Sequence, residues 1–529
     1  MAVSRGMHWN VHESLNRRDI GRVLRLARCC LVTLIAWQLN FLFRGHVGQV
    51  FGRCKPRTTM LCYKELPLLD EESNSLFLLL RGMTTVSFCR PSPPPLRWLQ
   101  RRLTAVVEKN PWLGGKLRRV EESVRLCFSE EVLDERNLAL SVEVVEPMNI
   151  TSSTPYEVIS QRISGSPAEV RSGLVCLENS SEPLLRVSLS DGKLNEFALV
   201  VSISHIIADG HTYYKLFSML TQDIPVVSLN PSRKLHFHRQ RLAAVGESEY
   251  DFIYSPGYVL NCLGSKVLYG RPRCRAYLVD AQKMNDVKVR EAETHHDLSF
   301  VSTNDVLTSV FARLIAARVC SMAVNFRHRL PGILEEDAGN YQGLLCLCPS
   351  DYASPGLVRT SLVRGKDTAV FRRCGREPAE PLPDFWETLS SRLAVITSWA
   401  FQGDPGLEGC EMILHLPHFD LDEVNSDMAV IFRPRAGQLA ALLMLEQGLT
   451  FEEAWSLCER KRPIVYPNVG FQQQLRYLEK IMTKVVDFKA CSESKKTSAT
   501  ELFRCYGRTG VVGVPGTFTG TTGFGAWLA

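Results

Sequence analysis

Residues 200–210 read VVSISHIIADG, an apolar run that leads directly into a His-x-x-x-Asp-Gly turn. Two aliphatic runs, 184–190 and 196–204, are separated by a short connection that contains Asp-Gly, which predicts a β-hairpin. The spacing of tyrosine, phenylalanine and leucine within 211–223 predicts a helix. The stretch therefore predicts a strand, a turn that carries His205, and a helix.

His205 has the chemistry of a general base. An unperturbed histidine has a pKa of about 6.5, so it is mostly neutral at cellular pH and can take a proton from a hydroxyl, amine or thiol. From the residues alone, Asp209 reads as a second catalytic group, and Gly210 is expected to permit a backbone turn that a residue with a Cβ would resist. The alternative is that His205 is a core histidine whose hydrogen bonds are satisfied.

Four further segments follow the pattern of one enzyme superfamily. They read NPWLGGKL at 110–117, STNDVLT at 302–308, VNFRHRL at 324–330 followed by GN at 339–340, and TSW at 397–399. With PLLRV at 183–187 and the histidine motif, they resemble the acyltransferases that include chloramphenicol acetyltransferase, plant BAHD acyltransferases, wax ester synthases and peptide synthetase condensation domains. The resemblance covers roughly residues 60–445.

This resemblance implies an α/β fold of two chloramphenicol acetyltransferase-like domains, each a mixed β-sheet flanked by helices, with the active site at their interface. The expected divisions are an N-terminal extension at 1–57, a first domain at 58–235, a crossover connection at 236–270, a second domain at 271–445, a phosphatase-like segment at 446–491 and a disordered tail at 492–529. Helices are predicted at 96–109 and 302–320, the second with a Ser-x-x-Asp capping box, whereas 224–270 shows no sustained period.

The resemblance also implies residue roles. His205 is the general base, and Asp209 faces away from the substrate and pairs with an arginine that holds the turn in shape. Arg327 and Arg329 match the arginine motif, and Arg327 is favoured. Gly210 is structural.

Thr397 and Trp399 are the candidate donors to the oxyanion or substrate. A hydroxyl and an indole N–H can both donate to a developing negative charge. The alternative for this segment is a buried aromatic residue beside a helix cap.

The implied activity is direct transfer of an acyl group from acyl-CoA, as co-substrate, to a hydroxyl or amine of a small or lipophilic acceptor. No bound cofactor is expected, and the chain is expected to be a monomer. The sequence has no Gly-x-Ser-x-Gly elbow, which agrees with a reaction that forms no acyl-enzyme. Two departures are the missing Asp-Phe-Gly-Trp-Gly element of plant enzymes and Ser204, where condensation domains have a second histidine. The alternative function is a non-catalytic binding or interaction protein.

Composition excludes several other classes. A net charge of +6 over 529 residues gives no case for nucleic acid as a partner. Seventeen cysteines without Cys-x-x-Cys spacing indicate reduced thiols, and neither they nor the twelve histidines show the spacing of a metal site.

The N-terminal extension has a basic and apolar character. Residues 17–43 combine five arginines with an apolar run at 29–43, which is shorter than the roughly 20 residues that span a bilayer. Membrane contact as a signal anchor or interfacial helix, a removed targeting segment, and an ordinary packed helix all remain open. Localisation is accordingly cytoplasmic or membrane-associated.

A second resemblance lies near the C-terminus. Residues 447–455 read QGLTFEEAW and 462–475 read RPIVYPNVGFQQQL, which resemble the closing helices of dual-specificity phosphatases. The catalytic His-Cys-x-x-Gly-x-x-Arg is absent, because Pro434 and Ala440 stand where cysteine and arginine are required. We interpret the segment as an inactive fragment, while 428–445 also fits a last acyltransferase hairpin.

Overall fold

The computed structural model describes residues 63–121, 123–129, 140–179, 181–192, 195–269, 274, 279–363, 371, 380–400, 406–421 and 426–432. The strands are β1 Tyr63–Pro67, β2 Met83–Arg90, β3 Lys116–Val120, β4 Ser123–Ser129, β5 Val142–Val144, β6 Leu185–Asp191, β7 Phe197–Ile203, β8 Val319–Asn325, β9 Gln342–Leu347, β10 Leu393–Ser398, β11 Glu411–His418 and β12 Asp427–Ile431.

The helices are numbered separately from the strands, also in chain order. They are α2 Asp70–Ser73, α3 Ser75–Leu78, α4 Leu96–Lys109, η1 Pro111–Gly114, α6 Tyr156–Ile163, α7 Gly173–Glu178, α8 Gly210–Thr221, α9 Phe237–Val245, α10 Glu247–Tyr254, α11 Pro256–Tyr269, α12 Ala281–Thr294, α13 Thr303–Leu314, α14 Pro349–Tyr352, α15 Pro355–Leu362 and α16 Phe385–Ser390.

Two mixed sheets organise the molecule. A five-stranded sheet has the order β11-β2-β7-β6-β5, and a four-stranded sheet has the order β12-β10-β8-β9. Each contains parallel and antiparallel neighbours, since β5 is parallel to β6 and β8 is parallel to β10, while the β2–β7 and β8–β9 pairs are antiparallel. This confirms the predicted α/β class with mixed sheets flanked by helices.

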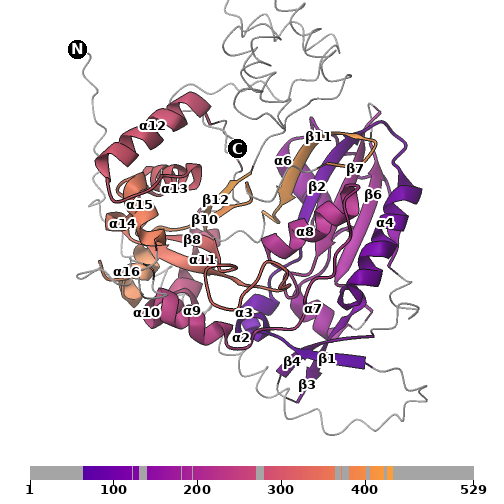
Figure 1. Ribbon diagram of the computed structural model, residues 1–529, viewed down its shortest axis with the longest axis horizontal. Helices are drawn as coiled ribbons and strands as arrows, with labels where there is room; N and C mark the ends of the chain where they lie inside the picture. The colour runs from indigo at the N-terminus through magenta and orange to yellow at the C-terminus, as the bar shows by residue number, and fades with distance from the viewer. Residues whose placement is uncertain are drawn as a thin grey trace, which may run out of the picture.

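The sheets form two lobes that lie side by side (Figure 1). The first lobe is the five-stranded sheet with α4, α6, α7 and α8, and the second lobe is the four-stranded sheet with α9 to α16. Each lobe has its own main hydrophobic cluster. The short helices α2 and α3 lie between the two lobes in the lower part of the view, above β1, β3 and β4.

Helices cover both faces of the first sheet. Leu199 and Val201 of β7 belong to the cluster that α4 and α8 complete, whereas Ala198 and Val200 belong to the cluster completed by α6. Because successive side chains of a strand point to opposite faces, a strand between two helical layers must be apolar at nearly every position. This explains why all of β7 is buried.

The local predictions around the histidine motif agree with the structure. Strands β6 and β7 are antiparallel, with Leu185 opposite Ile203 and Asp191 opposite Phe197. Helix α8 begins at Gly210 and ends at Thr221, close to the predicted 211–223. Helix α4 spans Leu96–Lys109, as predicted.

The helix predicted at 302–320 is wrong at its C-terminal end. Its Ser302–Asp305 capping box is present, but α13 ends at Leu314. Ala316 has a φ of 51°, the left-handed conformation that terminates helices, and the chain then enters β8 at Val319. Cys320 and Met322 therefore lie in a buried strand of the second lobe.

The stretch 224–270 is more regular than the sequence indicates. It contains α9, α10 and α11, which join the two lobes. Gly246, with a φ of 92°, is both the C-cap of α9 and the N-cap of α10. Because the chain changes direction between these helices, the helical spacing of apolar residues does not continue through the whole stretch.

One strand crosses between the lobes. β11 comes from the range expected to form the second domain, yet it pairs antiparallel with β2 in the first sheet, from Glu411 opposite Arg90 to His418 opposite Thr84. The domain bounds therefore stay a prediction, and the structure shows that the two halves of the chain are interleaved at this edge.

Several predictions lie outside the described residues. These are the extension at 1–57 with its segment 17–43, the second half of the hairpin at 428–445, the phosphatase-like segment at 446–491 and the tail at 492–529. Among the helices that the structure describes, none is long and apolar enough to span a bilayer.

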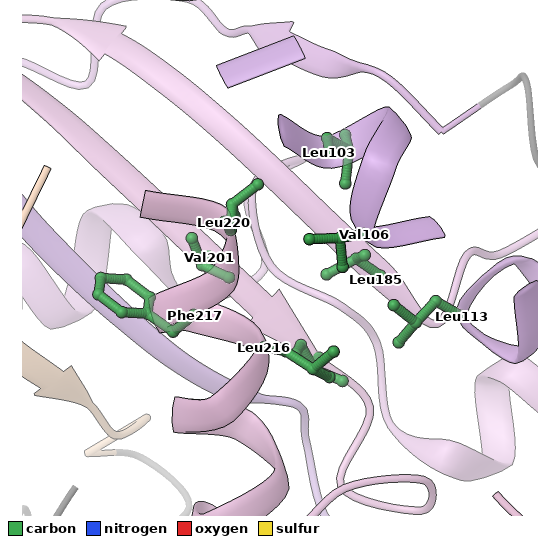
Figure 2. A pocket seen from close by; sticks show the side chains of 9 residues that line it. Leu103, Val106, Leu113, Leu185, Val201, Leu216, Phe217 and Leu220 are labelled. Atoms are coloured by element: carbon green, nitrogen blue, oxygen red, sulfur yellow. The ribbon is translucent and has the colours of Figure 1, made fainter. Parts of the chain in front are cut away.

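A small apolar cavity lies inside the first lobe, between α4, α8 and the sheet (Figure 2). Its lining side chains share an aliphatic or aromatic character; they are Leu103, Val106, Leu113, Leu185, Val201, Ile203, Leu216, Phe217 and Leu220. A gap of this kind deprives the surrounding side chains of contacts.

Adding one methylene group at this cavity should stabilise the protein. We expect Val106→Ile to raise the free energy of unfolding by about 0.5–1 kcal/mol, measured by urea unfolding. Val107→Ile is the matched control, because Val107 is buried on the same helix but does not line the cavity. Val107→Ile should overpack the core and lower the free energy of unfolding by about 1–3 kcal/mol. Equal effects of the two substitutions on the free energy of unfolding would contradict the prediction.

Candidate active site

His205 lies in the turn between β7 and α8. β7 is fully buried and ends at Ile203, and α8 begins at Gly210, so two rigid elements fix both ends of the turn. The side chain is half-buried, and the ring of Phe77 meets the imidazole edge-on at a centroid distance of 5.1 Å. Nδ1 is buried and has no hydrogen-bond partner among the described residues.

The surroundings of His205 favour its neutral form. Burial lowers the pKa of His205 below its usual value, and this effect outweighs the opposing effects of its own backbone carbonyl, Asp209, Asn340 and Glu72. A histidine with a lowered pKa remains unprotonated at and somewhat below neutral pH. The imidazole is therefore in the state that can accept a proton.

Asp209 turns its carboxylate into the protein. Its Oδ1 accepts from the backbone N–H of Thr212 at 2.9 Å, which caps α8. Its Oδ2 lies 2.6 Å from Nη1 of Arg327, and both side chains are essentially inaccessible to solvent. Although burial raises the pKa of Asp209, Arg327 and the Thr212 amide hold it below its usual value.

Arg327 ties this pair to the second lobe. Its guanidinium also donates to the carbonyls of Asp337 and Gly339 at 2.8–3.0 Å and to the Thr212 hydroxyl at 3.1 Å. Because these partners are buried, the guanidinium is held in one orientation. The expected partner of Asp209 is thus Arg327, as the arginine motif indicated.

The reason proposed for Gly210 is wrong. It does not have a positive φ, and a Cβ there would meet only Cε of Met83, at an ordinary 3.7 Å. The glycine that the backbone requires is Gly339, whose φ is +128° and whose Cβ would lie 2.7 Å from the Arg233 guanidinium. Gly339 belongs to the Gly-Asn motif, so its place in the sequence was recognised but its function was not.

Thr397 and Trp399 lie at and just after the end of β10. The backbone N–H of Trp399 donates to the carbonyl of Ile431 at 2.7 Å, and its ring meets Tyr214 edge-on at 5.8 Å and Phe419 at 5.8 Å. Within the described part of the chain, neither residue has a hydrogen bond or ring contact with His205. The structure thus brings Trp399 next to α8 and the end of β11 but not against the imidazole.

A second histidine, which the sequence did not single out, lies in this aromatic group. His415 of β11 bonds to the Ser87 hydroxyl through Nδ1 at 2.8 Å and to the Tyr214 hydroxyl through Nε2 at 3.1 Å. Burial lowers its pKa to about 3. With both nitrogens occupied by hydroxyl groups, His415 serves to connect β2, α8 and β11.

Metal ligands do not gather anywhere in the described ranges. No group of three or more histidine, cysteine, aspartate or glutamate side chains there has the geometry to hold a metal ion. The described cysteines form no disulfide with one another, and most of them are buried.

Comparison with known proteins finds similarity only at the level of structure. No family model matches the chain, and no curated protein matches its sequence. Vinorine synthase superposes with a TM-score of 0.43 and 16% identity over 72% of this chain and 89% of its own. TRI101 of F. sporotrichioides, solved with coenzyme A and T-2, superposes with a TM-score of 0.44 and 14% identity over 71% of this chain and 91% of its own.

A condensation domain is also among the similar structures. That of the Monacolin K polyketide synthase MokA has a TM-score of 0.39 and 14% identity, over 71% of this chain and 89% of its own. TM-scores below 0.5 at such identities carry no conclusion about activity. A functional assignment has to rest on the site itself.

Proposed function

We propose that this protein is an acyl-CoA-dependent acyltransferase that transfers an acyl group to a hydroxyl or amine of a small or lipophilic acceptor, with His205 as general base. One observation carries the proposal: His205 is half-buried with a lowered pKa, in a turn that the buried Asp209–Arg327 pair holds. The donor class comes from the motif resemblance, and CoA takes part as a substrate.

The reaction needs few steps. The His205 imidazole takes the proton of the acceptor O–H or N–H while the oxygen or nitrogen attacks the thioester carbonyl. The C–S bond then breaks, and the imidazolium returns its proton to the CoA thiolate. Atoms and charge balance without an acyl-enzyme, so a complex of enzyme, donor and acceptor is sufficient.

The negative charge on the carbonyl oxygen requires hydrogen-bond donors. Thr397 and Trp399 are proposed for this task, since both are half-buried at the end of β10. The Trp399 ring is oriented by Tyr214 and Phe419. For this role the thioester carbonyl would have to lie between His205 and the end of β10, with its oxygen directed at Thr397 and Trp399.

The test uses the full chain with a panel of acyl-CoAs from acetyl to long-chain, together with a pool of alcohols and amines. We expect at least one acyl-CoA to raise the melting temperature, because a ligand at 100 times its Kd stabilises the native state by about 2.7 kcal/mol. The same donor should release free CoA only when an acceptor is present. Absence of a shift and release equal to the buffer background would contradict the proposal and favour a non-catalytic binding protein.

A further inference from the structure

A second buried carboxylate, Glu72 of α2, lies behind the His205 turn. Its side chain is fully buried and accepts four hydrogen bonds. Oε2 accepts from the backbone N–H of Leu69 at 2.9 Å and from Nε of Arg233 at 2.8 Å. Oε1 accepts from the backbone N–H and the Nδ2 of Asn340 at 2.9 and 3.0 Å.

Asn340 connects this carboxylate to the catalytic turn. Its Nδ2 also donates to the backbone carbonyl of His205 at 2.7 Å and lies 3.3 Å from that of Ile206, so its two hydrogens are shared among three acceptors. Asn340 as a whole is 3% exposed, so water does not compete for these hydrogen bonds. Asn340 thereby joins Glu72 to the peptide groups on either side of Ile206.

Arg233 continues the same arrangement along the turn. Its Nη2 donates to the carbonyl of Ile207 at 3.4 Å, and its Nη1 donates to that of Ala338 at 2.9 Å. The carbonyls of His205, Ile206 and Ile207 are therefore all held by two side chains. Both of these side chains are anchored on the carboxylate of Glu72.

We propose that Glu72 is a positioning residue for His205: it anchors Asn340 and Arg233, which hold the carbonyls of the turn that carries the imidazole. Asp209 and Arg327 hold the other end of that turn. The geometry stands independently of the reaction, but the rate effect described below rests on the proposed acyl transfer.

The negative charge of Glu72 also affects the pKa of the His205 imidazole. The charged groups that act on His205 from the described elements around it are Asp209 and Glu72, and each is paired with an arginine, Arg327 and Arg233. Both carboxylates favour the protonated ring and so oppose the effect of burial. Removal of the Glu72 charge should therefore lower the pKa of His205 further.

The experiment compares Glu72→Gln with Glu71→Gln in the full chain. Glu71 is its sequence neighbour and is also buried in ion pairs, to Arg241 and His238 at 3.1 Å, and neither pair includes Asn340 or Arg233. Loss of either carboxylate perturbs a buried pair, so the two variants share a general loss of stability. They differ in their link to His205.

The first readout is the NMR titration of histidine Cε1–H groups in ¹³C-histidine-labelled protein, with the His205 signal assigned from His205→Ala. We expect E72Q to move the His205 signal and lower its pKa, while E71Q leaves both as in wild type. The second readout is kcat with saturating acyl-CoA, which should fall about 10- to 100-fold in E72Q, as expected for a misplaced catalytic group. E71Q should retain the wild-type kcat.

An unchanged His205 titration in folded E72Q, an unchanged kcat in E72Q, or equal effects of E71Q would each overturn the proposal. If the wild-type protein shows no acyl transfer, the proposed function fails and the NMR titration alone decides the positioning role. If E72Q does not fold, Asn340→Ala takes its place, because it leaves the Glu72–Arg233 pair intact and removes the link to His205. The His205 signal should then shift, and an unshifted signal would overturn the proposal.

Discussion

Replacing His205 with alanine is expected to lower kcat/KM for acyl transfer by about 100- to 10,000-fold, the usual contribution of a general base. Removal of the imidazole leaves the acceptor proton without a group to take it. Release of CoA by the full chain, with the best donor and acceptor from the panel, measures the effect. The protein should remain folded with only a modest fall in melting temperature, because the half-buried imidazole loses its contact with Phe77 but no hydrogen bond of Nδ1 within the described structure.

His296→Ala is the matched control for this variant. His296 is exposed in the turn after α12, and its loss should leave the rate unchanged. A His205→Ala protein that is folded and turns over at the wild-type rate would show that another group acts as the base, or that the proton leaves to solvent.

The pH dependence of the wild-type rate follows from the same residue. Because burial lowers the pKa of His205, the acid limb of kcat/KM in the free enzyme should lie below pH 6.5, the value for an unperturbed histidine. The residual rate of His205→Ala should lack this limb. A limb centred above pH 6.5 would contradict the assignment of a neutral, partly desolvated base.

Replacing Asp209 with asparagine is expected to reduce stability and activity together. The variant leaves the guanidinium of Arg327 buried without its charged partner, which typically costs about 3–5 kcal/mol. Urea unfolding measures the first effect and CoA release the second. A variant that melts like wild type and retains full turnover would remove the supporting role that we propose for the pair.

An exposed ion pair provides the contrast. Glu387 is 47% exposed and pairs with Arg318 on the surface of the second lobe. Glu387→Gln should change the free energy of unfolding by only about 0–1 kcal/mol, since solvent screens such pairs. Comparable losses at both sites would mean that burial of the Asp209–Arg327 pair has no special effect.

The Asp209 pair also predicts a pH window for stability. The folded-state pKa of Asp209 is lowered, so the stability that this carboxylate contributes is present above the unfolded pKa of about 3.9. It is lost as the pH falls through the folded-state value. Asp209→Asn should therefore show a weaker loss of stability below pH 4 than wild type does.

Local patterns were sufficient for the elements that carry the candidate base. Aliphatic runs on either side of an Asp-Gly pair predicted the β6–β7 hairpin, and helical spacing predicted α4 and α8, because each of these elements is stabilised along its own length. The histidine motif indicated His205, and the arginine motif indicated the partner of Asp209. The end of α13 was missed because a single left-handed residue, Ala316, carries no sequence signal when it is not glycine.

Only the tertiary structure decided which distant residues support the turn. No sequence motif indicated Glu72, yet it is buried against Asn340, which lies 268 residues further along the chain. β11 likewise leaves its own half of the chain to pair with β2. Periodicity and propensity describe neighbours in sequence, whereas the partner of a buried charge or of an edge strand is chosen by how the folded lobes meet. The amino-acid sequence by itself therefore determined the strand, the turn and the chemistry of His205, and the packing of the two lobes determined which buried carboxylates and side chains support it.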